Sequence, residues 1–86
     1  GGVDIEAGAG AITRGAATDV ITGGFVQLSA ADGITATTDA VTLEADNDAT
    51  NAILITDNGS VAIAGAGVVN TVNNANVTVT AADNLT

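Results

Sequence analysis

The chain carries a short apolar–polar alternation of period two that recurs five times. Each phrase places an aliphatic residue at every second position, with polar or small residues between, which is the pattern of a half-buried β-strand. All five fit one template, V-x-[I/L/V]-x-[A/G], and they begin at Val3, Val26, Val41, Val61 and Val77. The alternation therefore predicts an all-β chain built on an internal repeat.

The spacing of the repeat favours a solenoid. The leading valines are 23, 15, 20 and 16 residues apart, and a turn signal rich in Gly, Asp or Asn follows each strand. A second apolar segment, such as Ile53-Leu54-Ile55, comes after the turn. Coils of roughly 15–23 residues with two or three short strands and no helix are typical of a parallel β-solenoid. We predict a single right-handed β-helix of about five coils over residues 1–86.

In such a solenoid, equivalent side chains of successive coils stack about 4.8 Å apart along the axis. We therefore expect two internal columns of aliphatic side chains. The predicted core comprises Val3, Val26, Val41, Val61 and Val77 in one column, and Ile5, Leu28, Leu43, Ile63 and Val79 in the other.

The main structural alternative is an antiparallel β-sandwich, which also has short strands between Gly and Asn turns. A sandwich does not require the same phrase in every strand. It also usually buries several aromatic side chains, and Phe25 is the single aromatic residue of this chain.

The composition excludes several classes of protein. The chain has no Cys, His, Lys, Tyr, Trp, Met or Pro, and it has ten acidic residues against one Arg, for a net charge of −9. It therefore lacks the usual zinc ligands, and one Arg cannot form a basic surface for nucleic acid. No apolar run reaches the about 20 residues of a transmembrane helix, so we expect no membrane insertion.

Catalysis is not expected, because the common general bases and nucleophiles are missing. Ser29 and Ser60 have no basic partner in the sequence and are predicted to be strand or turn residues. Asp46 and Asp48, together with Arg14, resemble the acids and arginine that β-helical polysaccharide lyases and hydrolases use. Those enzymes need a groove built by many coils and long loops, which 86 residues cannot provide.

A calcium site is a minor hypothesis. Asp46-Asn47-Asp48 offers alternating hard oxygen ligands of the kind that Ca²⁺ prefers. Asp32, Asp46 and Asp83 each follow a predicted column valine by five or six residues, so they are expected to form an acidic stripe. The simpler interpretation is that these carboxylates are solvated turn residues that keep a fibre soluble.

Two further surface features are the Asn-x-Ser/Thr sequons and the Thr-x-Thr pairs. Asn58, Asn76 and Asn84 lie in Asn-x-Ser/Thr sequons, which are possible glycosylation sites, although the Asn and Thr content alone accounts for most of them. Stacked Asn and Thr side chains can instead form hydrogen-bonding ladders along a solenoid. The Thr-x-Thr pairs at 35–37 and 78–80 are not repeated in successive predicted coils, so ice binding is not favoured.

Three phrases of the chain resemble the repeats of filamentous haemagglutinin-like proteins. They are Gly24-Phe25-Val26-Gln27-Leu28-Ser29-Ala30, the segment from Ala40 to Asp48, and the segment from Asn76 to Thr86. That family comprises large secreted bacterial exoproteins with right-handed β-helical shafts, and autotransporter shafts share its motif. The resemblance implies a parallel β-helix and a secreted, surface-exposed protein.

We therefore expect a structural or adhesive segment of a bacterial surface filament or adhesin shaft, without catalysis or an organic cofactor. The expected partners are further repeats or other copies joined end to end, and a glycan or protein on a host or cell surface. The chain starts at a strand and stops early in a coil, which suggests a fragment or repeat unit. The alternative is a calcium-dependent surface-layer or carbohydrate-binding module.

Overall fold

The computed structural model describes residues 2–14, 19–72 and 75–86, and this part of the chain is all-β without a helix. The strands, in chain order, are β1 (Gly2–Glu6), β2 (Ile21–Ala30), β3 (Ile34–Asn47), β4 (Ile53–Asp57), β5 (Ala62–Asn70) and β6 (Val77–Ala81). Every strand pair among the described residues is parallel. The predicted fold class is confirmed, and the antiparallel sandwich is excluded.

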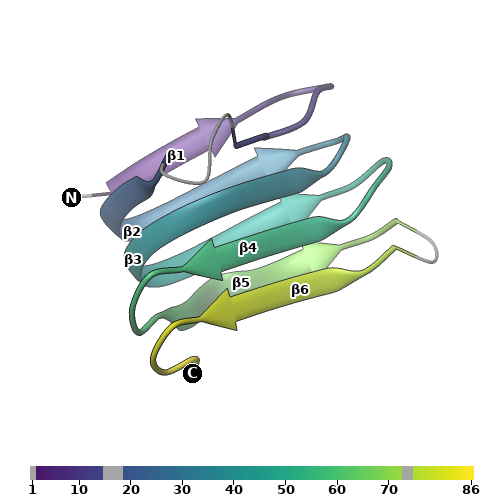
Figure 1. The fold of residues 1–86 in the computed structure, drawn as a ribbon. Coiled ribbons are helices and arrows are strands. Elements are labelled where there is room, and N and C mark those ends of the chain that lie inside the picture. The colour runs from purple at the N-terminus through teal and green to yellow at the C-terminus, as the bar shows by residue number, and fades with distance from the viewer. Residues whose placement is uncertain (1, 15–18, 73–74) are drawn as a thin grey trace.

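The strands wind into a solenoid with two walls (Figure 1). The first wall contains β1, β2, the second half of β3, and β5. The second wall contains the first half of β3, then β4 and β6. The chain descends one layer with each right-handed turn and completes about four coils. The prediction of about five is too high because the phrase at Val77 lies on the second wall of the fourth coil and does not begin a fifth.

Strand β3 joins the two walls by bending through a corner. Its residues 34–38 pair with β4, whereas residues 42–47 pair with β5. Before the corner the even-numbered side chains, such as Ile34, are buried, and after it the odd-numbered ones, such as Leu43, are buried. The bend therefore shifts the inward–outward alternation by one position.

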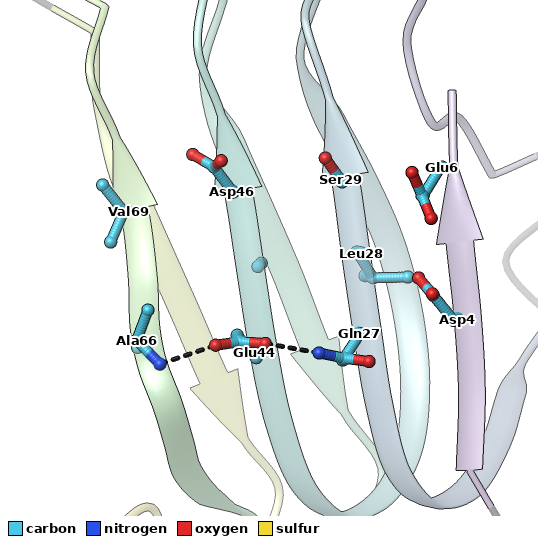
Figure 2. A pocket seen from close by; sticks show the side chains of 11 residues that line it. Asp4, Glu6, Gln27, Leu28, Ser29, Glu44, Asp46, Ala66 and Val69 are labelled. Atoms are coloured by element: carbon cyan, nitrogen blue, oxygen red, sulfur yellow. Dashed lines mark hydrogen bonds between the residues drawn. The ribbon is translucent and has the colours of Figure 1, made fainter. Parts of the chain in front are cut away.

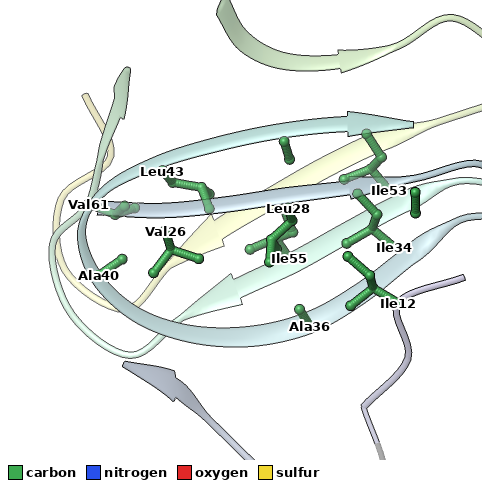
Figure 3. Packing of buried hydrophobic residues seen from close by; sticks show 12 residues of the cluster. Ile12, Val26, Leu28, Ile34, Ala36, Ala40, Leu43, Ile53, Ile55 and Val61 are labelled. Carbon is green, nitrogen blue, oxygen red and sulfur yellow. The ribbon is translucent and has the colours of Figure 1, made fainter. Parts of the chain in front are cut away.

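Aliphatic side chains from both walls meet in one narrow core (Figure 3). The strand register stacks them into columns, as expected for parallel coils. On the first wall the columns are Val3–Val26–Leu43–Ile63 and Ile5–Leu28–Ala45–Val68. On the second wall they are Ile12–Ile34–Ile53–Val77 and Ala36–Ile55–Val79.

The predicted columns are correct in the first two coils and wrong afterwards. Val3 lies opposite Val26 and Ile5 opposite Leu28, but Leu43, not Val41, lies opposite Val26. Val41 is 68% exposed because it lies at the bend of β3, where the alternation shifts.

The later coils show the same kind of displacement. Val61 is buried, but it precedes Ala62, which lies opposite Thr42. Ile63, not Val61, therefore occupies the column of Val26 and Leu43. Val77 continues the column of Ile53 on the second wall and is 45% exposed in the last coil. The remaining predicted core residues do pack inward. Val26, Leu28 and Leu43 are buried, and Val3, Ile5, Ile63 and Val79 are half-buried against the core.

Asn47 forms a polar anchor at the end of β3. Its side chain is fully buried, and its Oδ1 accepts a hydrogen bond of 2.7 Å from the backbone N–H of Gly33. Its Nδ2 donates to the backbone oxygens of Thr50 and Asn51, at 2.9 and 3.0 Å. Nδ2 also lies 3.3 Å from Oδ1 of Asn70, its partner in the next coil. This side chain therefore satisfies buried backbone groups of the turn and connects two layers.

Candidate functional site: an acidic groove on the first wall

The outer face of the first wall carries a groove of about 470 Å³ (Figure 2). Its floor is formed by outward side chains that alternate with the buried core positions along β1, β2 and β3. The register aligns these side chains into two rows across the strands. They are Asp4–Gln27–Glu44 and Glu6–Ser29–Asp46–Val69.

A bulge in β5 closes one side of the groove. Leu43 lies opposite Ile63 and Ala45 lies opposite Val68, so β5 has residues 64–67 where β3 has Glu44 alone. The backbone of Gly65 has a positive φ of 59°, which glycine adopts without steric cost. A side chain at this position would also overlap the carboxylate of Glu44. Both the positive φ and the position of the Glu44 carboxylate therefore favour glycine at position 65.

Glu44 connects three strands through its carboxylate, as Figure 2 shows. Its Oε1 accepts a hydrogen bond of 2.6 Å from Nε2 of Gln27 on β2, and its Oε2 accepts one of 2.6 Å from the backbone N–H of Ala66 on β5. The bond from Gln27, and after it the bond from Ala66, stabilise the charged form and hold the pKa of Glu44 below its usual value of 4.5. Glu44 is therefore a charged structural link between layers.

The other carboxylates of the groove are held apart by neutral residues. Gln27 and Ser29 on β2 lie between the carboxylates of β1 and those of β3. Carboxylates two strands apart are separated by about 9.6 Å, and those two residues apart along one strand by about 6.7 Å. In the described part of the chain, no three acidic side chains come close enough to hold one metal ion. The groove thus provides diffuse negative charge.

The structure places the predicted calcium ligands on either side of a buried residue. Asp46 lies in the groove and Asp48 follows the end of β3, and both are exposed, while Asn47 between them points inward. Calcium binding by this pair stays a prediction.

The predicted acidic stripe through Asp32, Asp46 and Asp83 is wrong. The Oδ1 atom of Asp32 accepts hydrogen bonds from Thr50 and Asn51 in the next turn, whereas Asp46 lies in the row of Ser29. The backbone N–H of Asp83 donates to the carbonyl oxygen of Gly59, in a different turn. The three carboxylates therefore occupy different positions of the coil. Equal spacing from the template valines does not place residues opposite one another in neighbouring coils.

The three sequon asparagines, Asn58, Asn76 and Asn84, are exposed, and each lies outside the strands. Their accessibility is compatible with glycosylation, which stays a prediction.

Ser29 lies in β2 and Ser60 in the turn before β5, as predicted. The groove was not predicted, because neither the register of β3 against β2 nor the bulge of β5 follows from the valine spacing.

Comparisons with protein-family models, curated proteins and solved structures give no match to this chain. The resemblance to filamentous haemagglutinin-like repeats therefore stays a prediction. Within the described ranges there is no helix with the length and apolar character needed to cross a membrane.

Proposed function

We propose that the chain is a structural segment of an extracellular bacterial filament or adhesin shaft, in which coils stack on coils to give mechanical reach. The observation that supports this role best is the continuity of the core columns through all layers. Each inner layer rests on the same parallel hydrogen bonds and aliphatic contacts, so length is added without a new kind of interface.

The last layer supports the proposal further. Val77 ends the column of Ile34 and Ile53 with 45% of its surface exposed, and Leu85, after the last strand, is 46% exposed. The strands of this layer, β5 and β6, lie at the lower edge of their walls (Figure 1). An open sheet edge with aliphatic side chains pairs readily with another strand. We propose that a coil of a second copy of the chain covers this edge.

The test is self-association of the chain at increasing concentration, followed by sedimentation velocity and electron microscopy. We expect thin rods that lengthen with concentration. Val77→Lys places a charge at the end of an internal column and is expected to stop this growth. Val41→Lys is the matched control, because Val41 is exposed at a corner of an inner coil.

Two results would refute the proposal. One is a chain that stays a single small particle at every concentration. The other is growth of Val77→Lys to the same length as the Val41→Lys control.

A further inference from the structure

The outer face of the second wall carries a two-column grid of threonines. Its outward positions are 35 and 37 on β3, 54 and 56 on β4, and 78 and 80 on β6. The register aligns them into the columns Thr35–Leu54–Thr78 and Thr37–Thr56–Thr80. Five of the six positions are therefore threonine. The two Thr-x-Thr pairs, at 35–37 and 78–80, are far apart in the sequence. In the fold they lie in alternate layers, and the layer between them is Leu54-Ile55-Thr56.

The grid is regular in both directions. Neighbouring strands lie about 4.8 Å apart, and alternate residues of one strand lie about 6.7 Å apart. These two repeats are close to the oxygen repeats on a prism face of hexagonal ice. Threonine is β-branched and therefore restricted at χ1, so its methyl and hydroxyl groups hold their positions with little entropy left to lose.

The hydroxyl groups of the grid are available to a ligand. Among the described residues, the hydroxyls of Thr35, Thr56, Thr78 and Thr80 form no hydrogen bond within the chain, although Thr37 accepts one of 2.7 Å from Nη1 of Arg14. Thr78 and Thr80 are exposed and Thr35 and Thr56 are half-buried, whereas Thr37, with 5% of its surface exposed, is buried and does not contribute a free hydroxyl. Four fixed hydroxyls with methyl groups between them can anchor an ordered layer of water.

The charge distribution indicates what such a face binds. The chain has ten acidic residues, yet none of the six grid positions is charged. Two charged side chains border the grid. Arg14 donates a hydrogen bond to Thr37, and Asp19 lines the same hollow as Thr35 and Thr37. Their charges are opposite, so this face offers no excess charge to an ionic ligand. The grid also has no aromatic residue, although stacked aromatic rings would give a large contact area with a sugar.

We infer that the second wall binds ice, with the threonine grid ordering water into positions shared with the crystal face. Methyl groups favour a cage of ordered water around them, and the hydroxyls connect that water to the protein. This inference does not depend on the filament proposal, because it concerns a wall of the solenoid and not its ends.

The test is the shape of ice crystals and the gap between their melting and freezing temperatures in solutions of the chain. We expect faceted crystals and a measurable gap. Thr56→Tyr puts a bulky ring at the middle layer of the grid and should abolish both effects. Thr22→Tyr is the matched control, since Thr22 is an exposed threonine of β2 outside the grid, and it should keep both effects. Circular dichroism and melting curves verify that both variants fold.

Several outcomes would overturn the inference. Round, unfaceted crystals with no gap for the parent chain exclude ice binding, and so does a Thr56→Tyr variant as active as the Thr22→Tyr control. Retention of the parent on cellulose or chitin powder, lost in Thr56→Tyr and without any effect on ice, assigns the face to a polysaccharide. Thr56→Tyr dissociating an assembly of the parent, again without an effect on ice, assigns it to a second copy.

Discussion

The hydroxyl of Thr38 donates a hydrogen bond of 2.6 Å to Oδ1 of Asp57, which lies directly opposite it in the next coil. Both side chains are fully buried. The same oxygen accepts a bond of 3.0 Å from the backbone N–H of Ala40, and Oδ2 accepts one of 3.1 Å from that of Gly59. Asp57 therefore satisfies the backbone at two bends of the chain as well as the hydroxyl of Thr38.

Removal of this carboxylate should be costly. Asp57→Ala leaves several buried donors without partners, and we expect a loss of about 3 kcal/mol in the free energy of unfolding. Thr38→Val removes one donor to the carboxylate and should cost about 1.5 kcal/mol. Urea denaturation measures both changes. Asp39→Ala, at an exposed neighbouring position, is the control and should stay within about 0.5 kcal/mol of the parent.

Leu43 is buried in the core and Val41 is exposed at the bend of β3, so substitutions at these two positions test the register of the strand. Leu43→Asp places an unpaired charge in the fully buried column and should cost more than about 3 kcal/mol. Val41→Asp changes a side chain that is 68% exposed and should cost less than about 1 kcal/mol. Equal stability of the two variants in chemical denaturation would show that the register of β3 is misassigned.

Gly65 should be less replaceable than Gly8, although both have a φ of 59°. Gly8→Ala meets open space and should cost only the backbone strain, about 1–2 kcal/mol. Gly65→Ala must also displace the carboxylate of Glu44, so its cost should be larger. A double-mutant cycle tests this reason, because the excess cost should disappear in a Glu44→Ala background. An excess that persists there would mean that the overlap is not its cause.

Acid should weaken the link between β2, β3 and β5. The lowered pKa of Glu44 means that its stabilising contribution is complete above its unfolded value near 4.5 and is lost as the pH falls through the folded value. We expect the stability of Glu44→Gln to depend less on pH than that of the parent between about pH 5 and pH 3. Gln27→Ala should reduce the dependence as well. Melting temperatures across this range measure the effect, and identical slopes for all three proteins would contradict it.

Calcium should have little effect on folding. Asp46 has Ser29 and Val69 as neighbours in its row, so an ion there would find few further ligands. We expect the same melting temperature in Ca²⁺ and in EDTA. If Ca²⁺ raises the melting temperature of the parent but not of Asp46→Asn, the calcium-dependent module becomes the better interpretation.

The period-two alternation predicts the strands and their inward faces, and the recurrence of one phrase every 15–23 residues predicts that the strands stack as parallel coils. The alternation could not predict where the chain bends between walls, and a bend shifts the inward face by one residue. Val41 fits the template and still lies outside the core for this reason.

The surfaces were harder to predict than the fold, since they depend on which residues of different coils lie opposite one another. Counting from the valines hides the match of Thr56 to Thr37 and Thr80, and it separates Glu44 from the Asp4–Gln27 pair. The Gly-rich turn signal that follows the phrase at Val61 consists of Gly65 and Gly67, and these residues form a bulge within β5. The two glycines indicate a departure from a regular strand, but the local sequence does not distinguish a bulge from a turn.

The bulge of β5 has a consequence for how such a chain can diversify. It projects extra residues away from the axis while the pairs on either side, Leu43 with Ile63 and Ala45 with Val68, keep their places. Insertions at this point would leave the neighbouring layers intact and alter only the rim of the groove. Longer peptides grafted between Ala66 and Gly67, which keep Gly65 and the backbone N–H of Ala66 in place, would therefore offer an evolving lineage, or an engineer, a way to display new sequences on an unchanged scaffold.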